Sequence, residues 1–91
     1  MLPIRWQIEA QADLAAILSY IAERSQHAAT DLYNEIDRTV SLLPRHPNLY
    51  RPGRVAGTHE MLVHSNYLVV YRVSATAIEI LSVVHTRQQY P

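Results

Sequence analysis

The chain contains no cysteine and no lysine among its 91 residues. Without cysteine, neither a disulfide framework nor a thiolate metal site can form, which fits proteins of the reducing cytosol. No apolar run reaches the roughly 18 residues of a membrane span, and no signal-peptide core is present. We therefore expect a soluble cytoplasmic protein that makes no contact with a membrane.

Because lysine is absent, all eight cationic side chains are arginines, and they are unevenly distributed. Residues 1–44 carry three arginines against six carboxylates, a net charge of −3, whereas residues 45–91 carry five against two, a net charge of +3. Four of the five histidines also lie in the second half. The planar fork of donors in arginine suits carboxylates and phosphates, so this half favours an anionic partner. A GC-rich genome would produce the same arginine bias without that role.

The length and the hydrophobic periodicity predict a single domain that spans residues 1–91. Alternating apolar and polar residues predict a strand at 3–8. Apolar stripes with a helical period predict helices at 10–24 and 28–43, the second ending at Pro44. The short break between the helices requires them to lie antiparallel or sharply crossed, with their apolar stripes on a common surface.

The second half reads as a loop followed by strands. The connection at 44–58 holds three of the five prolines and both glycines, so it predicts an ordered loop. The runs "HEMLV", "NYLVVYRV" and "AIEILSVVH" then predict three consecutive antiparallel strands, which are apolar on both faces. The expected fold is α+β, in the order β-α-α-β-β-β. An antiparallel sheet of three to four strands packs against a helical hairpin, with the first strand at an edge.

The ending "HTRQQYP" places three chemically useful side chains close together. RNA cleavage needs a base for the 2′-hydroxyl proton, a cation for the phosphoryl charge and an acid for the leaving oxygen. His85, Arg87 and Tyr90 could each take one of these roles. The structural alternative is a strand end, a solvated cation and an aromatic cap on the core.

Arg72 lies in the strand-like run "NYLVVYRV" and has a structural as well as a functional interpretation. If Ala75 and Thr76 form the last hairpin loop, Arg72 stands opposite Glu79 in a cross-strand ion pair.

The histidines His46, His59, His64 and His85 lie in the basic half. Their spacing lacks a metal-ligand pattern, so we expect no metal and no cofactor, and one or two of them would suit acid–base chemistry on RNA. The loop "RPGRVAGT" does not match a P-loop. Its arginines could instead clamp nucleic acid or a carboxylate-rich segment, or simply line a solvated turn.

The segments "ADLAAILSYIAER", "HPNLYRPGRVAGTHEMLVHSNYLVVYRV" and "ILSVVHTRQQYP", in the order β-α-α-β-β-β, resemble the RelE/ParE superfamily of bacterial toxins over nearly the whole chain. The resemblance is closest to the ParE-like branch. It implies a toxin of a type II toxin–antitoxin module, neutralised by a cognate antitoxin that wraps a disordered segment around it. A higher-order toxin–antitoxin assembly is also implied.

The superfamily resemblance implies one of two targets, or neither. ParE-like members block DNA gyrase, which requires contact residues and no catalytic set, and the candidates for contact are Arg51, Arg54, Arg72 and Arg87. RelE-like members cleave messenger RNA on the ribosome. The third alternative is an inactive module that retains only antitoxin binding.

Only some of the catalytic residues of RelE-like nucleases have a counterpart in this sequence. RelE-like nucleases have a catalytic arginine on the strand that reads "NYLVVY" here, and the matching position is Leu68, which cannot hold a phosphate. Their C-terminal basic and aromatic pair corresponds to His85 or Arg87 with Tyr90. His46 and His64 resemble the histidines of a histidine-dependent subgroup. The sequence leaves open whether the protein is an enzyme.

Overall fold

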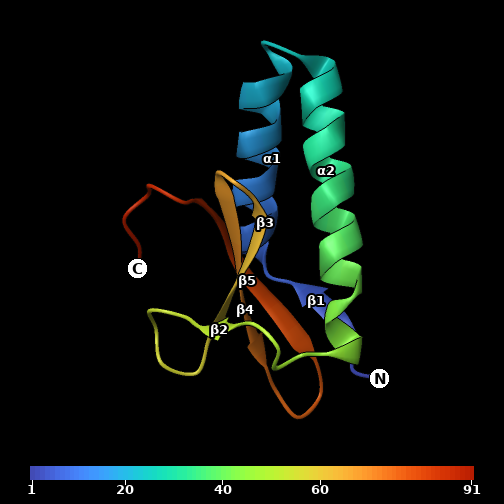
Figure 1. Cartoon of the computed structure of the whole chain (residues 1–91), viewed down its shortest axis with the longest axis vertical. Helices are drawn as coiled ribbons and strands as arrows, with labels where there is room; N and C mark the ends of the chain where they lie inside the picture. Colours follow the sequence, from blue (N-terminus) through green and yellow to red (C-terminus); the bar gives the residue numbers. More distant parts are fainter.

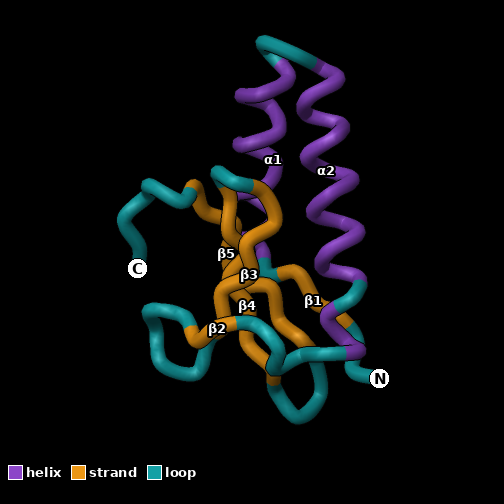
Figure 2. Tube along the Cα trace, viewed as in Figure 1, coloured by secondary structure: helices purple, strands orange, loops and turns teal.

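The computed structural model describes residues 1–91, which form a helical hairpin packed on one face of a sheet (Figures 1 and 2). In chain order the elements are β1 (Ile4–Trp6), α1 (Ile8–Ala22), α2 (Gln26–Ser41), a 3₁₀ turn η1 (Leu43–Arg45), β2 (Arg51–Pro52), β3 (His59–His64), β4 (Tyr67–Val73) and β5 (Ile78–His85). The turn between α1 and α2 extends past the sheet at the top of Figure 1. Neither helix has the length and apolar character needed to cross a membrane.

The sheet has five strands in the order β1-β5-β4-β3-β2. Strands β3 to β5 are antiparallel and β1 lies at an edge, as the sequence predicts. The two-residue strand β2, which the sequence did not predict, adds a further antiparallel strand at the other edge. However, β1 pairs with β5 in parallel, so the sheet is mixed rather than wholly antiparallel. The difference arises because β1 is joined to the rest of the sheet through the helical hairpin, and such a crossover allows parallel pairing.

The hydrophobic core lies between the helices and the sheet. From α2 it takes the stripe that the sequence predicts, together with Leu43 of η1. From the sheet it takes alternate residues such as Met61, Val69, Tyr71 and Ile80, all fully buried. Leu14, Ile17, Leu18 and Ile21 of α1 pack against this cluster but stay partly exposed. The α1 face is therefore less completely covered than the α2 face.

The first strand is shorter than predicted, and α1 begins earlier. Gln7 has extended backbone and caps the helix, while its carbonyl accepts the first helical hydrogen bond from Gln11 N at 3.0 Å. Ile8 therefore falls in the first helical turn and is 81% exposed, instead of continuing the half-buried alternation of Ile4 and Trp6. Strand alternation alone does not show where a helix begins.

The boundaries of α2 also differ from the predicted ones. The Oγ of Ser25 accepts a hydrogen bond from the backbone N of Ala28 at 3.1 Å, so Ser25 is an N-cap and the helix begins at Gln26. At the other end α2 stops at Ser41, and Pro44 lies inside η1, where its lack of an N–H is tolerated. The connection 44–58 is ordered, as expected, and contributes the two-residue edge strand β2.

Candidate functional site

The sheet face opposite the helices, here called the outer face, carries a second apolar cluster. Leu68 and Val70 of β4 and Val84 of β5 are all buried there, and the ring of Tyr90 packs against them. Tyr90 belongs to the C-terminal segment, residues 86–91, which follows β5. The prediction of strands that are apolar on both faces is confirmed, and the chain's own C-terminal segment covers part of the second face.

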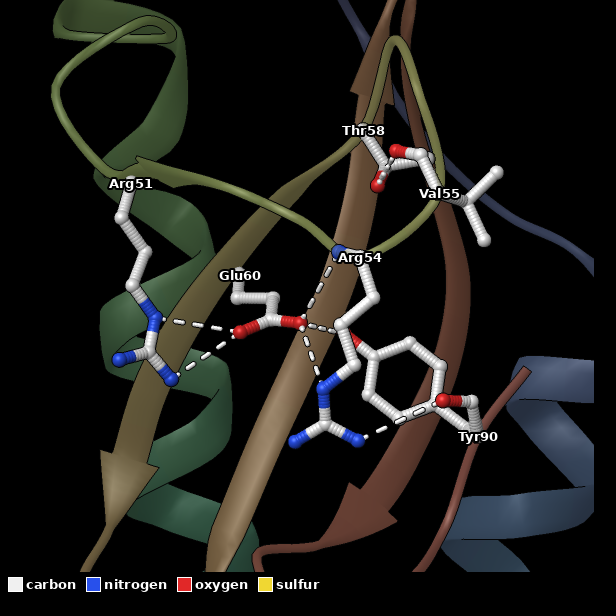
Figure 3. Close-up of polar contacts among 6 residues, drawn as sticks. All are labelled: Arg51, Arg54, Val55, Thr58, Glu60 and Tyr90. Carbon is white, nitrogen blue, oxygen red and sulfur yellow. Dashed lines mark hydrogen bonds and ion pairs between the residues drawn. The ribbon is translucent and has the colours of Figure 1, made fainter.

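Glu60 of β3 lies on the outer face, opposite Val70 of β4, and is only 5% exposed. Its Oε1 accepts hydrogen bonds from Arg51 Nε at 3.1 Å and forms an ion pair with Arg51 Nη2 at 3.0 Å. Its Oε2 accepts from the Tyr90 hydroxyl and from the backbone N of Arg54 at 3.4 Å, and Arg54 Nε lies 3.7 Å away. Figure 3 shows these groups converging on the carboxylate. We call Arg51, Arg54, Glu60 and Tyr90 the Glu60 network.

Arg54 joins the network to the C-terminal segment in two further ways. Its guanidinium carbon lies 4.4 Å from the centre of the Tyr90 ring, which is the geometry of a cation–π contact. Its Nη1 donates to the Tyr90 carbonyl oxygen at 3.4 Å. The hydroxyl, the ring and the backbone of Tyr90 are therefore all held by the network.

The loop at 53–58 places Arg54 beside Glu60. Gly53 N donates to Thr58 O at 2.8 Å, and the hydroxyl of Thr58 donates to Val55 O at 2.6 Å, so the loop is closed by its own bonds. Figure 3 shows Thr58 and Val55 side by side in this loop. A Cβ on Gly53 would overlap Thr58 Oγ1, and Gly57 has a φ of +84°. Gly53 thus leaves room for the Thr58 hydroxyl, and the positive φ at position 57 favours glycine.

A second ion pair lies elsewhere on the outer face. Arg72 and Glu79 are cross-strand partners, and Arg72 Nη2 lies 2.7 Å from Glu79 Oε1. The hairpin closes through Ser74 N and Ala77 O at 2.9 Å, which leaves Ala75 and Thr76 as its loop. This confirms the register and the ion pair that the sequence predicts.

The histidines near the β3–β4 turn flank Tyr67. The Nδ1 of His64 accepts from Asn66 N at 3.2 Å, and the Nδ1 of His85 accepts from Arg87 N at 3.1 Å. Both rings lie against Tyr67, with centroids 6.0 Å and 5.3 Å from it. Since each Nδ1 is an acceptor, a neutral ring carries its proton on Nε2.

The other two candidate histidines lie apart from this pair. His59 is at the opposite end of β3 from His64, where it stacks on Tyr71 and its Nδ1 contacts Tyr50 O at 2.9 Å. His46 is exposed at the end of η1. The histidines form no set with carboxylates that could hold a metal ion.

The proposed acid–base set is not assembled in this structure. The Tyr90 hydroxyl donates to Glu60, whereas His85 packs on Tyr67 and Arg87 is exposed. The position matched to a nuclease arginine, Leu68, is 2% exposed within the apolar cluster. Of the four arginines predicted to contact a target, Arg51, Arg54 and Arg72 are paired with carboxylates, and Arg87 is in none of these pairs.

A groove lies between α1 and α2, beside β1. It has a volume of about 440 Å³, and its lining includes Trp6, Leu14, Leu18 and Tyr33 with the carboxylate of Asp37. A second hollow of about 340 Å³ shares Leu18 and Tyr33 with it, so the two continue along the helical hairpin. The surface of the hairpin is therefore mostly apolar along this groove, with one carboxylate, that of Asp37, in its lining.

Sequence reasoning did not single out Glu60. The available signal was that Glu60 is one of only two carboxylates in residues 45–91, and that it alternates with Met61 and so faces outward. It also missed Asp13 of α1, whose Oδ2 accepts a hydrogen bond from Val83 N at 3.0 Å. That contact joins residues 70 positions apart, and no local pattern reveals it.

Comparisons with known proteins agree with this fold. The family model of the ParE toxin of the type II toxin–antitoxin system parDE matches residues 4–90. The Sinorhizobium fredii protein Y4kP, named as a candidate toxin, is 37% identical over 89 residues, which cover 97% of this chain and 92% of that protein.

Solved structures also superpose over most of the chain. A chain of the chromosomal ParDE toxin–antitoxin system from P. aeruginosa matches with a TM-score of 0.82 and 27% identity, covering 93% of this chain and 96% of that one. The YoeB/ParE toxin from Agrobacterium tumefaciens shares the fold, with a TM-score of 0.68 and 18% identity over 98% of this chain and all of its own. From its fold and from these matches, the chain belongs to the family of ParE toxins of type II toxin–antitoxin systems, within the RelE/ParE superfamily.

Proposed function

We propose that this toxin inhibits growth by binding DNA gyrase, and that a cognate antitoxin neutralises it. The observation that carries this proposal is the Glu60 network, which fixes the arginines and the C-terminal segment as a preorganised contact surface. A surface of this kind favours binding, because its side chains lose little freedom when a partner arrives.

The electrostatics of the surface support an acidic partner. Arg51 and Arg54 exceed Glu60 by one charge, and their side chains are 65% and 43% exposed although both contact the buried carboxylate. The exposed Arg87 adds a further cation at the C-terminal segment. A carboxylate-rich patch of a partner protein would meet oriented guanidinium donors there. Gyrase acts in the cytoplasm, where we therefore place the toxin.

The test is supercoiling of relaxed plasmid by purified gyrase at increasing toxin concentration. We expect supercoiling to fall with toxin and to recover when the antitoxin encoded beside it is added. Unchanged supercoiling at a large molar excess of folded toxin would refute the choice of gyrase.

We propose that the antitoxin packs on the groove between α1 and α2 and on the exposed part of the sheet. Tyr33 and Tyr20 are 48% and 58% exposed on the hairpin, and Leu62 is 58% exposed on β3. The acidic surface of the helices favours a basic amphipathic segment. Such a segment should be partly disordered when free, so mixing the two proteins should increase the helical circular dichroism signal. An unchanged signal on complex formation would argue against this mode.

One observation favours a second candidate, a ribosome-dependent endonuclease. His64 and His85 lie on either side of Tyr67, and each Nδ1 accepts a hydrogen bond from a backbone N–H. Each neutral ring is therefore held in the tautomer that carries its proton on Nε2. If this pair acted on messenger RNA, His64→Ala and His85→Ala would each abolish toxicity in folded protein. Full toxicity of both variants would exclude it.

Growth after induction of the toxin alone separates these activities from an inactive antitoxin-binding module. We expect growth to stop without antitoxin and to resume when antitoxin is supplied. A strain that grows normally with abundant folded toxin would favour the inactive module.

A further inference from the structure

Glu60 is a buried carboxylate that holds three separate parts of the chain. It contacts Arg51 of β2, Arg54 of the 53–58 loop and Tyr90 of the C-terminal segment. Glu79, on the same face, pairs only with Arg72 of the adjacent strand. Both side chains are therefore carboxylates on one face, but Glu60 contacts three segments of the chain and Glu79 pairs with one residue.

Beyond residue 88, the contacts of the C-terminal segment gather at Tyr90. Its first residues are held near the end of β5, because Thr86 N donates to Asn66 O at 2.8 Å and Gln88 N donates to His85 O at 2.8 Å. Further on, the hydroxyl of Tyr90 reaches Glu60, and Arg54 contacts both its ring and its carbonyl oxygen. Arg87 belongs to the first set, because its backbone N donates to His85 Nδ1 at 3.1 Å. The Glu60 network therefore holds the end of the segment, beyond residue 88, on the outer face.

The burial of Glu60 indicates a role other than stability alone. Taking a carboxylate out of water costs free energy. Well-packed apolar residues in place of a buried ion pair are often as stabilising as the pair or more so. What the carboxylate provides is geometry, since it accepts from three donors on three segments at once. Buried charges that fix one arrangement among several are a known use of such pairs.

We propose that Glu60 is the positioning residue of the toxin's contact surface. It orients Arg51 and Arg54 and holds the C-terminal segment over Leu68, Val70 and Val84. This inference rests on the proposed function, because the oriented groups are those that would meet the target. Glu60 itself is 5% exposed and acts through them.

The first arm of the test measures the order of the C-terminal segment in the free toxin, with no target present. Backbone heteronuclear NOEs of residues 86–90 report its motion on the picosecond to nanosecond timescale. We expect Glu60→Gln, which removes the charge at constant size, and Tyr90→Phe, which removes only the hydroxyl, each to lower these NOEs. Glu79→Gln is the matched control, since it removes a carboxylate from the same face without touching the segment, and it should leave them unchanged.

The second arm measures potency, as the toxin concentration that halves gyrase supercoiling and as growth inhibition in cells. Glu60→Gln and Tyr90→Phe should each reduce potency roughly tenfold, the scale of one charge-assisted hydrogen bond. Because both act on one contact, the double variant should lose little more than either single one. Glu79→Gln should keep wild-type potency.

The two arms separate this inference from the choice of target. If wild-type toxin leaves gyrase unaffected, the gyrase proposal fails, and the NOEs together with growth inhibition still decide the role of Glu60. Unchanged NOEs in Glu60→Gln, or a loosened segment with full potency, would overturn the inference. An equal loss in Glu79→Gln, or additive losses in the double variant, would overturn it as well.

Discussion

At the scale of single residues, Tyr71 is a buried core residue whose hydroxyl has a raised pKa. Its side chain is fully buried, its ring stacks on His59, and its hydroxyl donates to Pro47 O at 2.8 Å. Burial raises the pKa of the Tyr71 hydroxyl to about 12, and the nearby Tyr50 adds to the rise. The folded protein therefore holds this proton more tightly than the unfolded chain does.

The raised pKa gives the stability a dependence on alkaline pH. Below about 10, the ordinary pKa of tyrosine, both states are protonated and Tyr71 has no effect on the pH profile. Between about 10 and 12 the unfolded chain loses the proton first, so the free energy of unfolding should fall as pH rises. Urea unfolding at several pH values checks this. Tyr71→Phe should remove this part of the decrease, whereas Tyr20→Phe, at an exposed site, should retain it.

Asp13 joins α1 to β5 through one hydrogen bond, from Val83 N to its Oδ2. Asp13→Ala would leave that N–H without its partner, so we expect a loss of about 1–3 kcal/mol in the free energy of unfolding. Urea unfolding at neutral pH is the measurement. Glu9→Ala, an exposed acid in the first turn of the same helix, is the control and should change stability much less. Equal effects of the two substitutions would contradict the role of Asp13.

Residue-level prediction from the sequence succeeded where the partners are close along the chain. The Arg72–Glu79 pair follows from strand alternation and a two-residue loop, both of which are local. The Glu60 network joins positions 30 residues apart through Tyr90, and the Asp13 contact spans 70. Such contacts depend on how the elements pack, so no pattern in one segment specifies them.

At the scale of elements, the conformation of the 53–58 loop depends on its two glycines. Gly53→Ala would force Thr58 Oγ1 out of its bond to Val55 O, so we expect a loss of about 1–3 kcal/mol, as for overpacked sites. The C-terminal segment should also loosen, because Arg54 would shift. Gly57→Ala has open space around it and should cost only the backbone strain of its positive φ, about 1 kcal/mol. Urea unfolding and the NOEs of the segment compare the two, and a Gly53→Ala protein as stable as wild type would contradict this account.

The order of the elements was predictable, and their limits were less so. The apolar stripe of α2 and the three long strands have strong periodicity, and the structure confirms them. The errors fell at β1, whose alternation continued into the first turn of α1, and at Ser25, whose role as an N-cap was not recognised. Parallel pairing of β1 with β5 was missed, since it depends on the path through the helical hairpin.

At the scale of the whole molecule, the two charged halves of the sequence form two surfaces. The helical hairpin carries most of the acidic residues and the apolar groove, whereas the outer face carries Arg51, Arg54 and Arg72, paired with its two carboxylates, and the C-terminal segment. In our proposal, the hairpin binds a basic antitoxin segment and the outer face binds an acidic target. An antitoxin segment that also packs on Leu62 would lie beside the Glu60 network, because Leu62 lines one hollow together with Arg51 and Glu60.

The most direct measurement of the central proposal is the affinity of purified toxin for purified gyrase, by calorimetric titration. We expect saturable binding that weakens with salt, as contacts of exposed arginines should, and that is roughly tenfold weaker for Glu60→Gln than for Glu79→Gln. The absence of any binding by folded wild-type toxin at concentrations that stop growth would contradict the account.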